Sequence, residues 1–233
     1  MASKYQSLKD QVYEANMQLP ELGLVLYTFG NVSGVDHDLG VMAIKPSGVA
    51  YSELKPEQIV VLDLDNTVIE GDLRASSDTK THNALYRAYP DIGGIVHTHS
   101  TYAVAWAQAC QPIPCFGTTH ADHLAAEIPC TGIMRDDQIQ GDYEEETGVQ
   151  IIEALAGQSA AETEMILVAG HGPFTWGKSP EKAVYNSAVL EELARMAYLT
   201  LQINPQQSPL KKTLIEKHFQ RKHGKHAYYG QSC

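Results

Sequence analysis

Short apolar runs alternate with helical stretches along the whole chain, and this alternation limits the folds open to it. Apolar runs bounded by Gly, Asp or Pro are typical of strands and predict them at residues 24–29, 41–44, 58–62, 94–99 and 165–169. Apolar residues at helical spacing predict helices at residues 4–19, 79–89, 102–109, 147–156, 180–201 and 209–222. This mixture predicts an α/β sheet covered on both faces, and periodicity leaves a parallel or a mixed sheet open.

The size and charge of the chain limit its number of domains and the kinds of partner it can bind. Its 233 residues suit one domain spanning 1–233, which is long enough to bury its own core. A formal net charge of −11 argues against nucleic-acid partners and against an anionic membrane surface. We predict a cytoplasmic protein with free thiols. The four cysteines show no CxxC spacing, the N-terminus is polar, and no apolar run approaches the ~20 residues of a membrane span.

Three histidines next to predicted strands are the first chemical signal. His97 and His99 are two residues apart at a strand end, so both imidazoles can reach one ion. His171 follows another predicted strand, and the flanking Gly170 and Gly172 allow a close backbone approach. Asp78 can add a carboxylate oxygen or simply cap the helix that follows it. Together these residues predict a zinc-type site; polar strand ends and turns are the alternative.

Three turns rich in Gly and Ser offer donors for an anion. One covers residues 30–34, the second is Lys45-Pro46-Ser47-Gly48, and the third is Ser76-Ser77 at a predicted helix start. Free amides, hydroxyls and one lysine are what a phosphate dianion needs, whereas ordinary surface turns are the alternative. No turn matches a P-loop or a dinucleotide fingerprint, which disfavours nucleotide binding.

Candidate acid–base groups lie in the second half of the chain. Asp122 can carry a proton or cap a helix, and His120 and His123 can be further metal ligands. The acidic run at residues 142–146 is interpreted as a solvated face without chemistry. The basic, tyrosine-bearing C-terminus is predicted to pack on a neighbouring subunit or to carry an arginine for the phosphate, rather than to bind nucleic acid.

The order of the motifs resembles that of the L-ribulose-5-phosphate 4-epimerases, which belong to the class II aldolase superfamily. The resemblance covers essentially the whole chain. It implies a single α/β/α sandwich on a mixed, mostly antiparallel central sheet. It also implies a four-fold homotetramer with active sites at subunit interfaces, where the tail at about 209–233 packs. The motifs are Gly30-Asn31-Val32-Ser33-Gly34, Lys45-Pro46-Ser47-Gly48, Ser76-Ser77-Asp78-Thr79, His97-Thr98-His99, Thr119-His120-Ala121-Asp122, Gly170-His171-Gly172-Pro173-Phe174 and Tyr228-Tyr229-Gly230-Gln231.

The resemblance also implies roles for matching residues. Asp122 and Tyr229 would be the acid–base pair, with Tyr229 arriving from an adjacent subunit. The metal would be Zn²⁺, with Mn²⁺ or Co²⁺ as substitutes, because imidazole and carboxylate ligands accept all three. Its ligands would be Asp78, His97, His99 and His171. The sugar phosphate would be bound by Gly30, Asn31, Lys45, Ser47, Gly48, Ser76 and Ser77.

The implied reaction interconverts L-ribulose 5-phosphate and D-xylulose 5-phosphate by breaking and re-forming the C3–C4 bond. Epimerases of arabinose, ascorbate and xylulose breakdown all share this chemistry. The nearest alternative is an aldolase of the same superfamily acting on fuculose or rhamnulose phosphate, which uses a glutamate where this chain has Asp78. A metal-dependent hydrolase would need a second, carboxylate-rich set of metal ligands, which the sequence does not show. A non-catalytic metal-binding module would not account for the Lys- and Ser-bearing turns.

Overall fold

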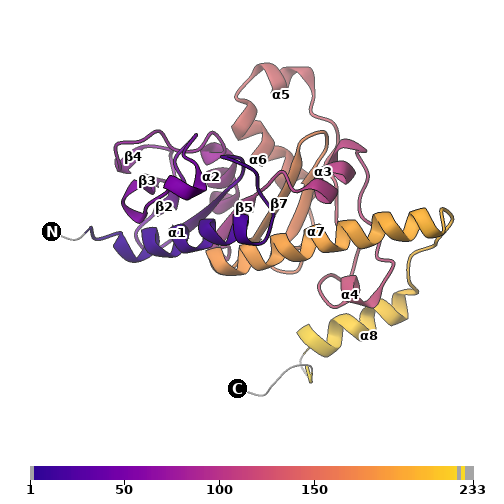
Figure 1. Ribbon diagram of the computed structural model, residues 1–233. Helices are drawn as coiled ribbons and strands as arrows, with labels where there is room; N and C mark the ends of the chain where they lie inside the picture. Colours follow the sequence, from indigo (N-terminus) through magenta and orange to yellow (C-terminus); the bar gives the residue numbers. More distant parts are fainter. Residues whose placement is uncertain (1–2, 225–226, 229–233) are drawn as a thin grey trace.

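The computed structural model describes residues 3–224, 227 and 228, and in it a seven-stranded sheet carries helices on both faces (Figure 1). The strand order is β4-β3-β2-β1-β5-β7-β6, and each neighbouring pair is antiparallel. The strands are β1 (Asn31–Asp36), β2 (Val41–Ile44), β3 (Val60–Asp63), β4 (Val68–Glu70), β5 (Gly94–His97), β6 (Met165–Val168) and β7 (Gly172–Gly177).

Helices connect these strands. The α-helices are α1 (Gln6–Glu21), α2 (Thr79–Ala88), α3 (Thr101–Gln108), α4 (Thr118–Ala121), α5 (Asp136–Gln140), α6 (Tyr143–Ala154), α7 (Pro180–Ile203) and α8 (Lys212–His223). Two short 3-10 helices, η1 (Tyr51–Glu53) and η2 (Pro56–Gln58), lie between β2 and β3. None of the helices in the described residues is both long enough and apolar enough to span a bilayer.

Alternating side chains along the strands create two cores. Met42 and Ile44 of β2 pack with residues of α2 and α6, whereas Val41 and Ala43 pack with residues of α1. Both sets are apolar, so β2 is buried on both faces, as a strand covered by two helical layers must be. β3, β5 and β6 divide in the same way, with α7 sharing the α1 face. The α/β/α sandwich on a mostly antiparallel sheet is therefore confirmed.

The predicted strand at residues 24–29 is wrong. This segment runs in turns and extended backbone, and β1 begins only at Asn31, inside the motif interpreted as a turn. Three of its apolar side chains are exposed: Leu26 by 69%, Tyr27 by 83% and Phe29 by 55%. Tyr27 also has a positive φ of 54°, which a strand does not allow. An apolar run indicates a strand only when the fold covers it.

The backbone of β1 is fixed by the helix before it. Buried Asn16 of α1 accepts a hydrogen bond from the amide of Val32 at 2.9 Å and donates one to the carbonyl of Val32 at 3.0 Å. The helix itself runs to Glu21, beyond the predicted end at residue 19, and Pro20 lies inside its last turn.

Several elements were not predicted. β4 has three mainly exposed residues at the sheet edge, and β7 was interpreted only as a glycine turn around His171. The remaining predicted strands and helices exist, and none of their ends is shifted by more than four residues; for example, α6 begins at Tyr143 rather than at residue 147. The short helix α4 packs against α8, and in Figure 1 both lie below α7, on its side away from the sheet.

Candidate active site

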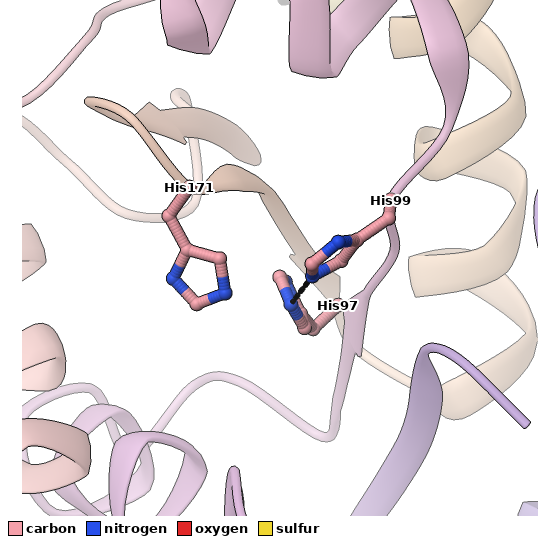
Figure 2. A group of neighbouring side chains, drawn as sticks. All are labelled: His97, His99 and His171. Carbon is pink, nitrogen blue, oxygen red and sulfur yellow. Dashed lines mark hydrogen bonds between the residues drawn. The ribbon is translucent and has the colours of Figure 1, made fainter.

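Three histidines converge at one end of β5 and β7. Each of His97, His99 and His171 offers one ring nitrogen, and these three atoms lie within 4.8 Å of one another. The Nε2 atoms of His97 and His99 are 3.0 Å apart, and the ring centroids of His97 and His171 are 4.7 Å apart (Figure 2). Such a group of nitrogen donors can hold a metal ion.

The sheet places His97 rigidly. It pairs with Asn31 of β1 on one side and with Phe174 of β7 on the other. The ring of Phe174 stacks on the imidazole at a centroid distance of 4.3 Å. Nδ1 of His97 lies 3.0 Å from the carbonyl oxygen of Pro173. A carbonyl can only accept, so Nδ1 carries the proton and Nε2 offers its lone pair to the cluster.

The protonation state of the cluster suits a metal. Burial, followed by the nearby His97 and His99, lowers the pKa of His171 to about 4. Burial also lowers the pKa of His99. At neutral pH both rings are therefore neutral, which is the form that binds metal ions. The donor set thus fits a divalent cation of the zinc type.

Asp78 lies in the same cavity, at the start of α2, but not among the mutually close nitrogen donors. Its Oδ2 accepts a hydrogen bond from Nδ2 of Asn31 at 2.6 Å. Burial alone would raise its pKa, but His97, His82 and the Asn31 bond outweigh burial and lower the pKa below its ordinary value. Asp78 is thus an ionised carboxylate beside the histidines, with Oδ1 open to a ligand role.

The buried amine of Lys45 also lines the cavity. This side chain is 1% exposed, and its Nζ lies 3.5 Å from the carbonyl oxygen of Thr28 and 4.9 Å from the ring centroid of Tyr51. Burial lowers its pKa to about 8. No ion pair within residues 3–224, 227 and 228 includes Lys45. A buried cation without an acidic partner favours an anionic ligand.

The turns around Lys45 are held together by backbone pairing. The amide of Ser76 donates to the carbonyl of Lys45 at 3.2 Å, and the amide of Ser47 donates to the carbonyl of Arg74 at 2.8 Å. Gly30 is constrained differently: its φ is +75°, and a Cβ there would lie 2.9 Å from the carbonyl oxygen of His97. Only glycine fits this approach.

One cavity of about 500 Å³ brings these groups together. Its wall includes all the residues that the resemblance implies for the metal and for the sugar phosphate. They are Gly30, Asn31, Lys45, Ser47, Gly48, Ser76, Ser77, Asp78, His97, His99 and His171. The segment around Gly30 enters the cavity as the start of a strand rather than as the predicted turn.

This arrangement agrees with comparisons to known proteins. The sequence profile described as class II aldolase and adducin N-terminal domain matches residues 10–198. The chain belongs to the class II aldolase family. Among solved structures of this family, an L-fuculose 1-phosphate aldolase is similar with a TM-score of 0.81 and 26% identity, covering 95% of this chain and 97% of that one. An L-fuculose-1-phosphate aldolase from Thermus thermophilus is similar with a TM-score of 0.67 and 25% identity, covering 87% and 98%.

Closer relatives of this class II aldolase family member are known by sequence. An L-ribulose-5-phosphate 4-epimerase, UlaF, from Salmonella paratyphi B is 54% identical over 226 residues, which is 97% of this chain and 99% of the relative. The protein of the same name from Salmonella typhi is also 54% identical over the same coverage. The resemblance to epimerases is thus confirmed along nearly the full length.

Of the two predicted acid–base residues, only Asp122 lies in the described part of the chain, and it is not among the residues that line the cavity. Asp122 lies at the end of α4, where Nη2 of Arg221 contacts its Oδ2 at 2.7 Å and Nδ1 of His218 contacts its Oδ1 at 2.9 Å. Burial would raise its pKa, but these α8 partners outweigh it and lower the pKa. Tyr229 lies outside the described residues.

The two further histidines considered as ligands lie elsewhere. His120 is buried, and its Nε2 lies 3.0 Å from the carbonyl oxygen of Ala126, so it holds the α4 loop. His123 lies beside Tyr185 of α7, with ring centroids 5.9 Å apart. Neither belongs to the three-histidine cluster in the described part of the chain.

The sequence interpretation missed one wall of the cavity. Tyr143 and Glu144, in the acidic run assigned to a solvated face, line it together with Thr28 and Phe29. The missed signal is the position of the acidic residues: carboxylates in a first helical turn stabilise its free amides. A helix starting at Tyr143 brings this end of α6 beside the histidines.

Proposed function

We propose that this protein is an L-ribulose-5-phosphate 4-epimerase that depends on a divalent cation, with Zn²⁺ as the resident ion. The observation that carries this proposal is a single cavity that combines the three histidines and Asp78 with the buried amine of Lys45. Relatives 54% identical over nearly the whole chain bear that name.

The cavity has the two ends that a sugar phosphate requires. Lys45 and the hydroxyls of Ser47, Ser76 and Ser77 bind the phosphate dianion, because they pair a buried cation with short polar donors. Gly30, Asn31 and Gly48 complete this wall with backbone and amide groups. The carbonyl end of the sugar then reaches the histidines.

The histidines and Asp78 hold the cation at the carbonyl end. A bound divalent cation supplies Lewis-acid stabilisation of the negative charge that develops on the substrate oxygens as C3–C4 breaks. Asn31 orients the Asp78 carboxylate through its 2.6 Å hydrogen bond, and Pro173 fixes the tautomer of His97. Asp78 and His97 are therefore preorganised as ligands.

Inversion at C4 requires two proton carriers on opposite faces of the aldehyde. Asp122 removes or returns the proton of the C4 hydroxyl on one face, and Tyr229 does so on the other. Because Asp122 lies outside the cavity of its own chain, it is assigned to a neighbouring subunit. The resemblance implies the same origin for Tyr229. Such an assembly is a homotetramer with its active sites at subunit interfaces.

Exposed apolar side chains at the rim support this assembly. Leu26, Tyr27 and Phe29 precede Gly30 at the cavity and are all more than half exposed. A cluster of large apolar side chains beside a polar site is typical of an interaction surface.

The described cysteines, Cys110, Cys115 and Cys130, are free thiols, which supports the cytoplasm as the compartment.

Product analysis tests the function. The metal-loaded protein is incubated with L-ribulose 5-phosphate, and the products are separated by chromatography. We expect D-xylulose 5-phosphate with little free glycolaldehyde phosphate. Accumulation of glycolaldehyde phosphate and dihydroxyacetone would assign the protein to the aldolases instead, and an unchanged substrate would refute both activities.

The buried lysine predicts a pH effect on substrate binding. With a pKa of about 8, Lys45 is a cation at pH 7 and loses its proton as the pH rises above 8. We expect KM for the sugar phosphate to rise several-fold between pH 7 and pH 9, because the phosphate loses its charged partner, while kcat changes less. In Lys45→Gln, KM should be high and independent of pH over this range. A parallel rise of KM in the variant would show that another group titrates.

A further inference from the structure

The outer ring nitrogens of the metal-site histidines have different partners. Nδ1 of His97 faces the carbonyl of Pro173, as described above. In Figure 2, one ring nitrogen of His171 points toward His97 and the other points away from the cluster. Nδ1 of His171 lies 3.4 Å from the phenol oxygen of Tyr143. A metal-bound histidine usually donates its second N–H to such a partner, which fixes the ring orientation.

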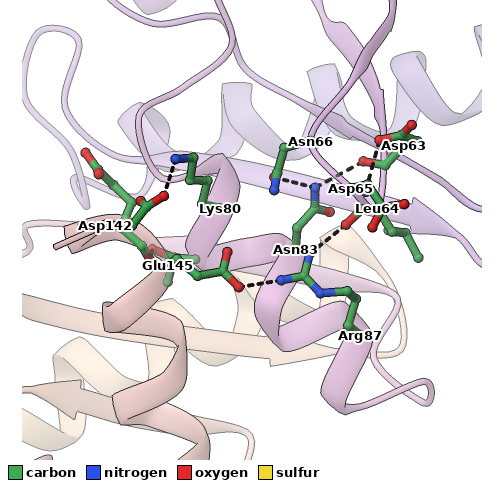
Figure 3. A network of polar contacts seen from close by, with 11 residues as sticks. Asp63, Leu64, Asp65, Asn66, Lys80, Asn83, Arg87, Asp142 and Glu145 are labelled. Carbon is green, nitrogen blue, oxygen red and sulfur yellow. Dashed lines mark hydrogen bonds and ion pairs between the residues drawn. The ribbon is translucent and has the colours of Figure 1, made fainter. Parts of the chain in front are cut away.

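Tyr143 reaches this place because α6 is anchored to α2. Lys80 of α2 forms an ion pair with Asp142, directly before Tyr143, and Nη2 of Arg87 contacts Oε1 of Glu145 at 2.5 Å (Figure 3). These two pairs are called the α2–α6 latch. Exposed ion pairs stabilise a fold only weakly, but two pairs that flank Tyr143 fix its position along α2.

Two buried contacts strengthen the same junction. Oγ1 of Thr81 donates to the carbonyl oxygen of Glu144 at 2.6 Å. At Gly148 of α6 a Cβ would lie only 2.6 Å from Cβ of Ala84, so the two helices approach as closely as glycine permits. Asp78 lies directly before α2, and thus one helix locates both Asp78 and the first turn of α6.

We propose that Tyr143 is a positioning residue for the metal centre: its phenol oxygen accepts the Nδ1–H of His171 and holds Nε2 toward His97 and His99. The α2–α6 latch fixes the position of Tyr143 along α2 and so keeps its phenol oxygen beside His171. The inference rests on the proposed metal-dependent function and adds to it a residue that holds a ligand without touching the ion.

Removal of one hydroxyl tests the inference. In Tyr143→Phe we expect the affinity for Zn²⁺, measured by competition with a chromophoric chelator, to fall roughly 10- to 100-fold. The absorption bands of bound Co²⁺ should also shift, because the imidazole of His171 is no longer held in one orientation. The side chain is 38% exposed, so the fold should tolerate the change and the metal-free variant should unfold at the wild-type temperature.

Tyr89→Phe is the matched control. It removes the same hydroxyl from a half-buried tyrosine that follows α2 at the end remote from Asp78. Its Zn²⁺ affinity and Co²⁺ spectrum should equal those of the wild type. If Tyr143→Phe also matches the wild type in both measurements, the positioning role is refuted while the metal centre stands. If the wild-type protein itself binds neither ion, the proposed function fails, and the inference fails with it.

The latch is tested by non-additivity. The double variant Lys80→Met/Arg87→Met should bind Zn²⁺ less tightly than the wild type, by a smaller factor than Tyr143→Phe. Adding Tyr143→Phe to it should give no more than the loss seen for Tyr143→Phe alone, because both changes act through one contact to His171. Losses that simply multiply would refute the link between the latch and Tyr143.

Discussion

Replacing His97 with asparagine will abolish metal binding and reduce turnover by on the order of 10³-fold or more. The amide of asparagine occupies the place of Nδ1, so the contact with the carbonyl of Pro173 is kept while the Nε2 ligand is lost. Bound zinc is measured by elemental analysis of the purified protein, and turnover by formation of D-xylulose 5-phosphate. Loss of the ring stacked on Phe174 should lower the stability by only about 1–2 kcal/mol.

His97→Gln is the informative companion variant. Its amide reaches the place of Nε2 but leaves the Pro173 carbonyl without its donor. We expect it to retain weak metal binding and a small part of the turnover, above that of His97→Asn. Full zinc occupancy in His97→Asn would contradict the assignment of this histidine as a ligand.

Mixed oligomers of two inactive variants will recover activity. Asp122→Asn lacks the proton carrier and His97→Asn lacks the metal ligand, so each should be inactive alone. If Asp122 serves the cavity of a neighbouring subunit, a random equal mixture holds about one quarter of sites with both an intact His97 and an intact neighbouring Asp122. Co-expression with two affinity tags yields the mixed oligomer, and its turnover per site should be about a quarter of the wild-type value.

Two controls define this experiment. Oligomers mixed after assembly, without exchange of subunits, should remain inactive. Thermal unfolding of Asp122→Asn shows whether loss of the contact to Arg221 has released α8. A mixed oligomer without activity, built from folded variants, would refute the assignment of Asp122 to the cavity of a neighbouring subunit.

The metal ligands and the phosphate wall follow from local patterns in the sequence. His97 is the last residue of β5 and His99 follows it by two residues, so the end of one predicted strand brings both to the same place. Lys45 and Ser47 follow the strand 41–44, which the structure contains with the same bounds. In each case the motif sits at the end of a predicted element, so its location depends little on the rest of the fold.

Other features depend on contacts that a local pattern does not contain. Leu24 to Phe29 has the composition of a strand, but Asn16 of α1 pairs with Val32 and so starts β1 later. Tyr143 is part of an acidic run that looks solvated until Lys80 and Arg87 of α2 bring it to the cavity. The role of Asp122 as a proton carrier comes from the resemblance. Within one chain Asp122 contacts α8 and not the cavity, so the mixed-oligomer experiment must show which subunit's cavity it serves.

The central claim is that one metal ion per chain is held by His97, His99, His171 and Asp78. Diffraction data collected on either side of the zinc absorption edge locate the ion directly. The account predicts one anomalous peak per chain, within about 2.0–2.2 Å of three Nε2 atoms and a carboxylate oxygen of Asp78. A zinc-loaded crystal with no peak among these four side chains, or with its peak elsewhere, would contradict it.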